Sequence, residues 1–267
     1  MPDPVPFADS PNRLFAVTVA RREQLSPAFV RLGLTGPGLA AFAPAGRDLR
    51  VKILLPGPAG YPATLVDGLT EATWRAAWRA LPAADRPVMR SYTAPRVDPA
   101  ARWLDLDVYL HEPAGPASAW AAGAQAGDPL LVSAPAAGAG DPSHGVQWEP
   151  GAATHVVIGA DETAFPAVAG ILAALGPEVR ATLLLEAADP AAYRSWRRPA
   201  PGRSSTVRRR PRRTRRSTAG SPPRARGWRS CGGRCSRSGW DRSGCTRRAT
   251  GSTGRAGRGT DPGRGPV

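Results

Sequence analysis

The first 135 residues consist of short runs in which hydrophobic and polar positions alternate. Alternation places one set of side chains on each face of an extended strand, and glycine, proline and aspartate separate one run from the next. Many short strands at this spacing are typical of a closed or nearly closed antiparallel barrel. The five clearest runs are LFAVTVARREQL, FVRLGLTG, LRVKILLP, WLDLDVYLHE and PLLVSAP.

One segment between these runs has a helical period instead. Residues 71–82, EATWRAAWRALP, place Trp74, Ala77, Trp78 and Leu81 three or four positions apart. This spacing predicts one amphipathic helix. We expect its tryptophans to pack into the core rather than against a cofactor.

The pattern changes at residue 154, where THVVIGADETAFPAVAGILAALGPEVRATLLLEAADP follows the order strand, loop, helix, strand. THVVIG is an uninterrupted apolar run, which predicts a strand buried on both faces. Gly176-Pro177 ends the helix, and ATLLLEAAD gives the second strand of a βαβ unit. We therefore predict an antiparallel β-barrel over residues 12–148, followed by a truncated parallel α/β nucleotide-binding domain over residues 152–193. One such unit cannot bury both faces of a parallel sheet, so an apolar face and edge should stay exposed.

Residues 194–267 have a different composition. They hold 22 basic and two acidic residues, a net charge of +20, whereas residues 1–193 hold 14 basic and 19 acidic residues, a net charge of −5. The segment contains no Leu, Ile, Phe, Met or Lys. It cannot form an aliphatic core, so we predict a disordered, arginine-rich tail without regular packed structure beyond about residue 197.

The tail raises two questions about partners. Its run VRRRPRRTRR would bind polyanions in low salt. It lacks the regular aromatic interleaving of a stacking platform, so we expect no specific nucleic acid as a partner. The three cysteines, at positions 231, 235 and 245, have no fourth ligand nearby, which argues against a zinc site.

Targeting signals are absent from the sequence pattern. The first residues, MPDPVPFADSPNR, lack the charged-then-apolar order of a signal peptide, and no apolar run approaches the length of a membrane span. We therefore expect a cytoplasmic protein that makes no membrane contact.

The most informative motif of the first region is MRSYTAPR, residues 89–96. On a strand, Arg90 and Tyr92 share one face and Thr93 turns to the other. A guanidinium can bind a phosphate through two parallel hydrogen bonds, a tyrosine ring can stack on a flat heteroaromatic system, and a threonine can bond a ring nitrogen. These groups suit a flavin dinucleotide. The alternative is an edge strand with a surface arginine.

A second block follows about twenty residues later. His111 stands at the end of a strand, and the turn Gly115-Pro116-Ala117-Ser118 leads into a helix. Ser118 is placed as the N-cap of that helix, and the free amides of a helix N-terminus bind anions. His111 either contacts a ligand or has a structural role.

These blocks resemble those of the siderophore-interacting proteins, flavin-dependent ferric-siderophore reductases of the ferredoxin-reductase superfamily. Residues 90–93, RSYT, are similar to the family's flavin signature, and residues 111–121 resemble its pyrophosphate block. Residues 159–167, GADETAFPA, are close to the family's G-D-E-T-A-x-P-A, and DLRVKILLP resembles a strand that ends in K-L-x-x-P. The resemblance runs in order from about residue 12 to 190.

The resemblance implies an N-terminal FAD-binding barrel and an electron path from NAD(P)H through FAD to ferric iron in a siderophore. NAD(P)H would dock at the loop that contains Asp161, Glu162 and Thr163. Reduction would release the iron, because hard oxygen ligands hold ferrous iron weakly. The implied FAD contacts are Arg90, Ser91, Tyr92, Thr93, His111, Gly115, Pro116, Ala117 and Ser118. No residue is assigned as catalytic or as a metal ligand.

The substrate would meet basic residues at the flavin mouth, because siderophore complexes are often anionic. Arg50 and Lys52 alternate along one strand and are the candidates, the alternative being a solvated strand face. We expect a monomer. The alternative functions are a flavin-less siderophore-binding protein and a nucleic-acid-binding protein that acts through the basic tail.

The sequence departs from the family at two places. Residues 134–138, APAAG, stand where the family has a glycine-rich segment, and their methyl groups could crowd a cofactor. Ala160 is inserted between Gly159 and Asp161.

The tail suggests a change of coding register. If the gene is read in another register, each shifted codon consists of the last base of one codon and the first two bases of the next. Over residues 244–254 the shifted codons permit the translation V-Y-A-A-G-Y-W-V-H-G. This translation includes the G-Y-W motif near which the family's sequences end. The same register permits an amphipathic helix just before it. Our interpretation is that the register changes between about residues 193 and 202, which makes the arginine tail a by-product without a selected function.

Overall fold

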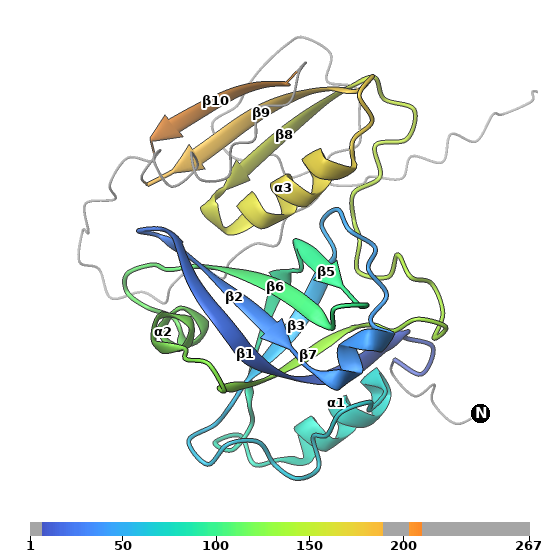
Figure 1. The fold of residues 1–267 in the computed structure, drawn as a ribbon, viewed down its shortest axis with the longest axis vertical. Coiled ribbons are helices and arrows are strands. Elements are labelled where there is room, and N and C mark those ends of the chain that lie inside the picture. Colours follow the sequence, from blue (N-terminus) through green and yellow to red (C-terminus); the bar gives the residue numbers. More distant parts are fainter. Residues whose placement is uncertain (1–6, 189–202, 210–267) are drawn as a thin grey trace, which may run out of the picture. The chain divides into compact units, whose positions relative to one another are not determined.

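The computed structural model describes residues 7–188 and 203–209. Its first part is a seven-stranded antiparallel sheet with the strand order β4-β3-β7-β1-β2-β6-β5 (Figure 1). The strands are β1 (Asn12–Ser26), β2 (Phe29–Thr35), β3 (Arg50–Leu55), β4 (Val88–Thr93), β5 (Arg96–Asp98), β6 (Trp103–Tyr109) and β7 (Pro129–Pro135). All five alternating runs of the sequence form strands, which confirms the predicted fold class for this region.

The sheet curls into a half-barrel because the long, bent strand β1 joins its two halves, β4-β3-β7 and β2-β6-β5. The first half of β1 pairs with β7 and the second half with β2, and a register shift between Val19 and Arg21 bends the strand. β4 and β6, from opposite halves of the sheet, approach each other. The concave side holds a core of aliphatic side chains from every long strand, among them Val30, Leu32, Val51, Ile53 and Leu106.

Three helical segments belong to this region: the 3-10 helix η1 (Pro37–Ala41), α1 (Glu71–Ala80) and α2 (Pro116–Gly123). α1 confirms the helix expected from the tryptophan spacing, and Trp74 is fully buried in a cluster with Leu14 and Leu54. Thr70 caps the helix by accepting the N–H of Thr73 at 3.2 Å. The helix therefore seals one side of the sheet.

The second region begins with β8 (His155–Asp161), the 3-10 helix η2 (Glu162–Ala164), α3 (Phe165–Ala174) and β9 (Arg180–Ala187). β8 and β9 are parallel, and α3 lies along one face of them (Figure 1). Ile158, Leu183 and Ile171 meet in the core between helix and sheet. The predicted βαβ unit is confirmed.

The prediction that THVVIG is buried on both faces is wrong. Burial alternates along β8, and Val157 is 59% exposed while Ile158 is 1% exposed. On β9, Leu184 is 39% exposed on the same outer face. The cause is that α3 covers only one side of these strands within the described part of the chain.

One further strand was not expected. Residues 203–209, RSSTVRR, form β10 (Arg203–Arg209), which pairs in parallel with β9. The prediction that nothing beyond about residue 197 has regular structure is therefore wrong for this segment. An edge strand offers unpaired backbone groups, which an extended segment without proline or glycine can satisfy whatever its apolar content. The rest of the predicted tail, with its three cysteines, lies outside the described residues.

None of the helices in the described ranges is both long and apolar enough to cross a membrane.

Candidate functional site

A cavity of about 300 Å³ brings together seven of the fourteen predicted site residues. Its walls come from the ends of β4 and β6 and from the first turn of α3. The sequence-predicted residues that line it are Arg50, Arg90, Ser91, Tyr92, Thr93, His111 and Thr163. The MRSYT segment and His111 therefore share one site, although they are about twenty residues apart in the chain.

The strand register orients the RSYT segment as the alternation predicts. Arg90 pairs with Ile53 and Tyr92 with Val51, so the two side chains share one face of β4. Arg90 is exposed, and its Nη1 donates to the carbonyl of Met89 at 2.8 Å. Burial against the barrel raises the pKa of Tyr92 to about 12, opposed by Arg90. The phenol therefore stays protonated near neutral pH and can donate a hydrogen bond.

Ser91 and Lys52 form a pair on the other face of the paired strands β3 and β4. The Nζ of Lys52 donates to the Oγ of Ser91 at 2.5 Å. Burial lowers the pKa of Lys52, and the charges of Arg50 and Arg75 lower it further. Lys52 does not line the cavity, whereas Arg50 does. Of the two candidate substrate contacts, only Arg50 lines the cavity, whereas Lys52 donates a hydrogen bond to Ser91.

The β6 wall of the cavity is aromatic. The rings of Tyr109 and His111 stack with centroids 5.9 Å apart, and Phe29 packs on Tyr109 at 5.4 Å. Phe29 also stacks on Phe165, the first residue of α3, at 6.1 Å. A row of rings therefore joins the barrel to the helix along one side of the site.

The helix after His111 starts differently from the prediction. The N-cap is Gly115, and Ser118 lies inside the first turn, so the assignment of Ser118 as the cap is wrong. Pro116 at the first position fixes the helical start earlier. The buried Ser118 hydroxyl instead accepts the backbone N–H of His111 at 3.2 Å.

This helix start lies beside the cavity rather than in its lining. Gly115 touches the His111 ring, since a β-carbon at Gly115 would lie 3.5 Å from both Cε1 and Nε2. Gly115 has no side-chain oxygen for the N–H groups of the first turn, which include those of Ala117 and Ser118. Those amides suit an anion.

The acidic residues of the GADET segment have local structural contacts. The Oδ1 of Asp161 accepts the N–H of Thr163 at 3.0 Å and its hydroxyl at 2.6 Å, which caps η2. The buried Glu162 accepts the N–H of Ala188 at the end of β9. Of the three predicted nucleotide contacts, only Thr163 lines the cavity.

Among the cavity residues that sequence analysis missed are Asp48, Asp107 and Tyr109. Asp107 is buried and accepts two hydrogen bonds from Arg31, at 2.7 and 2.8 Å. Burial raises the pKa of Asp107, and the Arg31 guanidinium opposes that rise. The signal was present in the two aspartates of WLDLDVY, which alternate with apolar residues, but the arginine partner of Asp107 comes from another strand.

The predicted departures from the family do not obstruct this cavity. Ala134 and Ala136 point into the barrel core, and none of residues 134–138 lines the site. Ala160 packs in the core between α3 and the parallel sheet.

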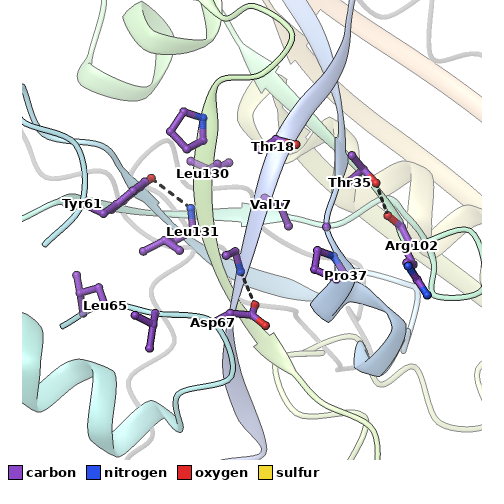
Figure 2. A pocket seen from close by; sticks show the side chains of 14 residues that line it. Val17, Thr18, Thr35, Pro37, Tyr61, Leu65, Asp67, Arg102, Leu130 and Leu131 are labelled. Atoms are coloured by element: carbon purple, nitrogen blue, oxygen red, sulfur yellow. Dashed lines mark hydrogen bonds between the residues drawn. The ribbon is translucent and has the colours of Figure 1, made fainter. Parts of the chain in front are cut away.

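A larger cavity of about 730 Å³ lies elsewhere on the barrel, between β1, β7 and the segment from Tyr61 to Asp67 (Figure 2). The fold itself uses several of its polar groups. Asp67 accepts the N–H of Ala16 at 2.7 Å, and the Tyr61 hydroxyl accepts the N–H of Leu131 at 3.2 Å. No predicted site residue lines it, so the smaller cavity is the candidate site.

Two family models match the chain. The siderophore-interacting FAD-binding domain matches residues 18–139, and the siderophore-interacting protein model matches residues 153–229. The chain belongs to the siderophore-interacting protein family. The second match continues past residues 193–202, so it does not support a register change there.

Two solved structures show the same fold, and the first is a siderophore-interacting protein. SipS of Aeromonas hydrophila is 27% identical with a TM-score of 0.57, over 76% of this chain and 71% of that one. A siderophore utilization protein from T. fusca is 29% identical with a TM-score of 0.57, over 75% and 70% of the two chains.

Curated relatives extend beyond the part that matches. An uncharacterized protein of Mycobacterium tuberculosis is 35% identical over 191 residues, 69% of this chain and 60% of the relative. An NADPH-dependent ferric-chelate reductase of Escherichia coli is 34% identical over 126 residues, 46% of this chain and 45% of that protein. The chain thus spans well under two thirds of the length of these relatives.

The barrel of this family member fits the cofactor that its family model names. An exposed guanidinium, a protonated phenol and a stacked pair of rings share one cavity. The helix start beside it has no capping side chain. Phosphates and a planar ring system are the groups that such a set can hold.

Proposed function

We propose that this protein is a flavin-dependent oxidoreductase that passes electrons from NAD(P)H, through FAD, to ferric siderophores and so releases their iron. One observation carries the proposal: a single cavity joins Arg90, Tyr92 and His111 of the barrel to Thr163 and the first turn of α3. The similarity to an NADPH-dependent ferric-chelate reductase supports the same reaction class.

The side chains divide the work of holding FAD. Arg90 would bind a phosphate, and the amides of Ala117 and Ser118 at the start of α2 would suit an anionic group of the cofactor. Tyr92 would donate a hydrogen bond from its protonated phenol, and Thr93 would bond a ring nitrogen. FAD, when bound, supplies the chemistry that accepts a hydride and delivers single electrons.

The other side of the cavity would receive the two substrates. Thr163 and the first turn of α3 form the wall for the nicotinamide nucleotide. Arg50, exposed at the mouth, would attract an anionic ferric siderophore. Lys52 acts indirectly, since it holds Ser91.

Flavin binding tests the proposal. Purified protein should show the visible absorbance of bound FAD, and Arg90→Ala should weaken FAD binding about ten- to a hundredfold, the worth of a charge-assisted hydrogen bond. Arg79→Ala, an exposed arginine on α1 outside the cavity, is the control and should bind FAD like the parent. A parent protein without FAD affinity would leave the flavin-less alternative.

A further inference from the structure

The turn between η1 and β3 has an unusual backbone. Gly46 and Arg47 are consecutive residues with φ of +64° and +54°. The left-handed region is natural for glycine but costs free energy at arginine, so the surrounding structure must hold Arg47 there. Two such residues in succession reverse the chain sharply and push the carbonyl of Arg47 outward.

That carbonyl meets helix α3 at Gly170. A β-carbon at Gly170 would lie 1.9 Å from the carbonyl oxygen of Arg47 and 2.9 Å from its carbonyl carbon. Both are backbone atoms, which cannot move aside as the end of a flexible side chain can. The helix reaches this position only because residue 170 is glycine.

The same turn holds the segment that connects the barrel to β8. The carboxylate of Asp48 accepts the N–H groups of Gln147 at 3.2 Å and Trp148 at 3.1 Å. The N–H of Arg50 donates to the carbonyl of Gly145 at 3.1 Å. Trp148 in turn packs with Phe29 and α3. The five consecutive residues 46–50 thus contact helix α3 and the segment that connects the barrel to β8, and they lead directly into strand β3.

The contact at Gly170 bears directly on the candidate site. Pro166 and Ala167 line the cavity and lie four and three positions before Gly170, on the same face of α3. Asp48 and Arg50, which belong to the turn and to β3, line the same cavity. A displacement of the helix at Gly170 would therefore move one wall of the cavity against the other.

We propose that the turn 46–50 and Gly170 form a positioning device that sets the spacing between the flavin side of the cavity and its nucleotide side. Gly170 and Arg47 are positioning residues, which act through the helix and the strand that they hold. The inference rests on the proposed function, because the spacing matters when a nicotinamide must approach the flavin. A misplacement of about 1 Å in such a pair costs roughly a hundredfold in rate.

The test compares Gly170→Ala with Gly123→Ala in the full chain. Both are helical glycines, but a β-carbon at Gly123 meets nothing within 4 Å. Each substitution gains helix propensity, so Gly123→Ala should keep or raise the melting temperature. We expect Gly170→Ala to lower it, to speed hydrogen exchange at the Gln147 and Trp148 amides, and to slow flavin reduction by NADPH at least about tenfold. FAD affinity should match the parent.

A second variant separates strain at the turn from general damage. Arg47→Gly removes the cost of the left-handed arginine and lets the turn relax. Combined with Gly170→Ala, it should restore part of the lost amide protection and melting temperature, a coupling that independent sites do not show. If Gly170→Ala does not fold, Asp48→Ala should give the same fast exchange at Gln147 and Trp148.

The outcomes are distinct. Equal amide exchange and equal melting behaviour in the two glycine variants overturn the positioning device, whatever the flavin does. A parent chain that binds no FAD overturns the proposed function and leaves the exchange comparison valid. If the parent binds FAD but NADPH does not reduce it, the amide exchange and melting temperatures of the two glycine variants still decide whether the positioning device exists.

Discussion

The barrel and the parallel sheet are built from strands of similar apolar content, yet their faces are covered very differently. In the barrel, β3 turns Val51 and Ile53 into a closed core, and Leu54 on its other face is also buried, under α1. In the parallel sheet, Leu183 is 2% exposed and its neighbour Leu184 is 39% exposed. A curled antiparallel sheet covers much of itself, whereas a parallel sheet depends on helices from outside for each face.

The difference also separates the two halves of the candidate site. The proposed flavin side stands on the half-barrel, with its motif on β4, whose register is fixed by pairing with β3. The proposed nucleotide side stands on helix α3, which contacts the barrel through the turn 46–50 and the ring of Phe29. We therefore expect FAD binding to tolerate damage to the second region better than nicotinamide-dependent turnover does.

The largest expected effect concerns the open face of the parallel sheet. If the coding register changes within the tail, resequencing the gene around codons 190–205 will reveal it. The restored chain should then gain βα elements, cover Val157 and Leu184, and show higher solubility and nicotinamide-dependent turnover. Confirmation of the present register in the DNA, with tail peptides found in an active soluble protein, overturns this account. The family match to residue 229 spans the residues at which the change of register is expected.

A large effect is also expected from breaking the buried ion pair on the barrel. Arg31→Met leaves the Asp107 carboxylate buried without its bidentate partner, which should cost about 3–5 kcal/mol of unfolding free energy near neutral pH. Arg21→Met, which breaks the exposed pair with Glu23, should cost less than about 1 kcal/mol. Denaturant unfolding of both variants measures the difference.

The pH dependence of Arg31→Met has a definite sign. Burial raises the pKa of Asp107, and the Arg31→Met substitution removes the guanidinium whose hydrogen bonds and charge oppose that rise. A carboxyl whose folded pKa exceeds its unfolded pKa favours the folded state at low pH, and that stability is lost as pH rises through the folded pKa. The defect of Arg31→Met relative to the parent should therefore shrink as pH falls toward the ordinary aspartate pKa of about 3.9. A defect that is constant from pH 5 to 8 would contradict the unpaired carboxylate.

A smaller and sharper contrast comes from adjacent residues of β9. Leu183→Ala removes a buried side chain and should cost about 2–5 kcal/mol. Leu184→Ala, on the open face, should stay within about 1 kcal/mol of the parent and aggregate less. Equal losses at the two positions would mean that the outer face is covered after all.

The alternation of apolar residues predicted the fold class because it has a local physical cause. Each alternating run of the barrel forms a strand, and the spacing of the tryptophans predicts α1. An element with one buried face repeats its apolar residues at its own period, every second residue in a strand and every third or fourth in a helix. The prediction for THVVIG was wrong because its cause is not local. A continuous apolar run indicates that both faces of a strand can be buried, but whether a second layer of helices covers the other face depends on other parts of the chain. The strand β10 was missed because backbone pairing, which sequence composition does not report, placed it at the edge of β9.

The candidate site divides along the same line. The sequence by itself determined that Arg90 and Tyr92 share a face, that His111 ends a strand before a helix, and that Thr163 lies between a strand and a helix, because each follows from local period and turn chemistry. Only the tertiary structure decided that these residues share a cavity with Asp48 and Asp107, that Lys52 holds Ser91, and that Gly170 admits the carbonyl of Arg47. Those contacts join residues 39 to 123 positions apart, and their geometry depends on how the sheet curls and where the helix lands, which no local pattern encodes.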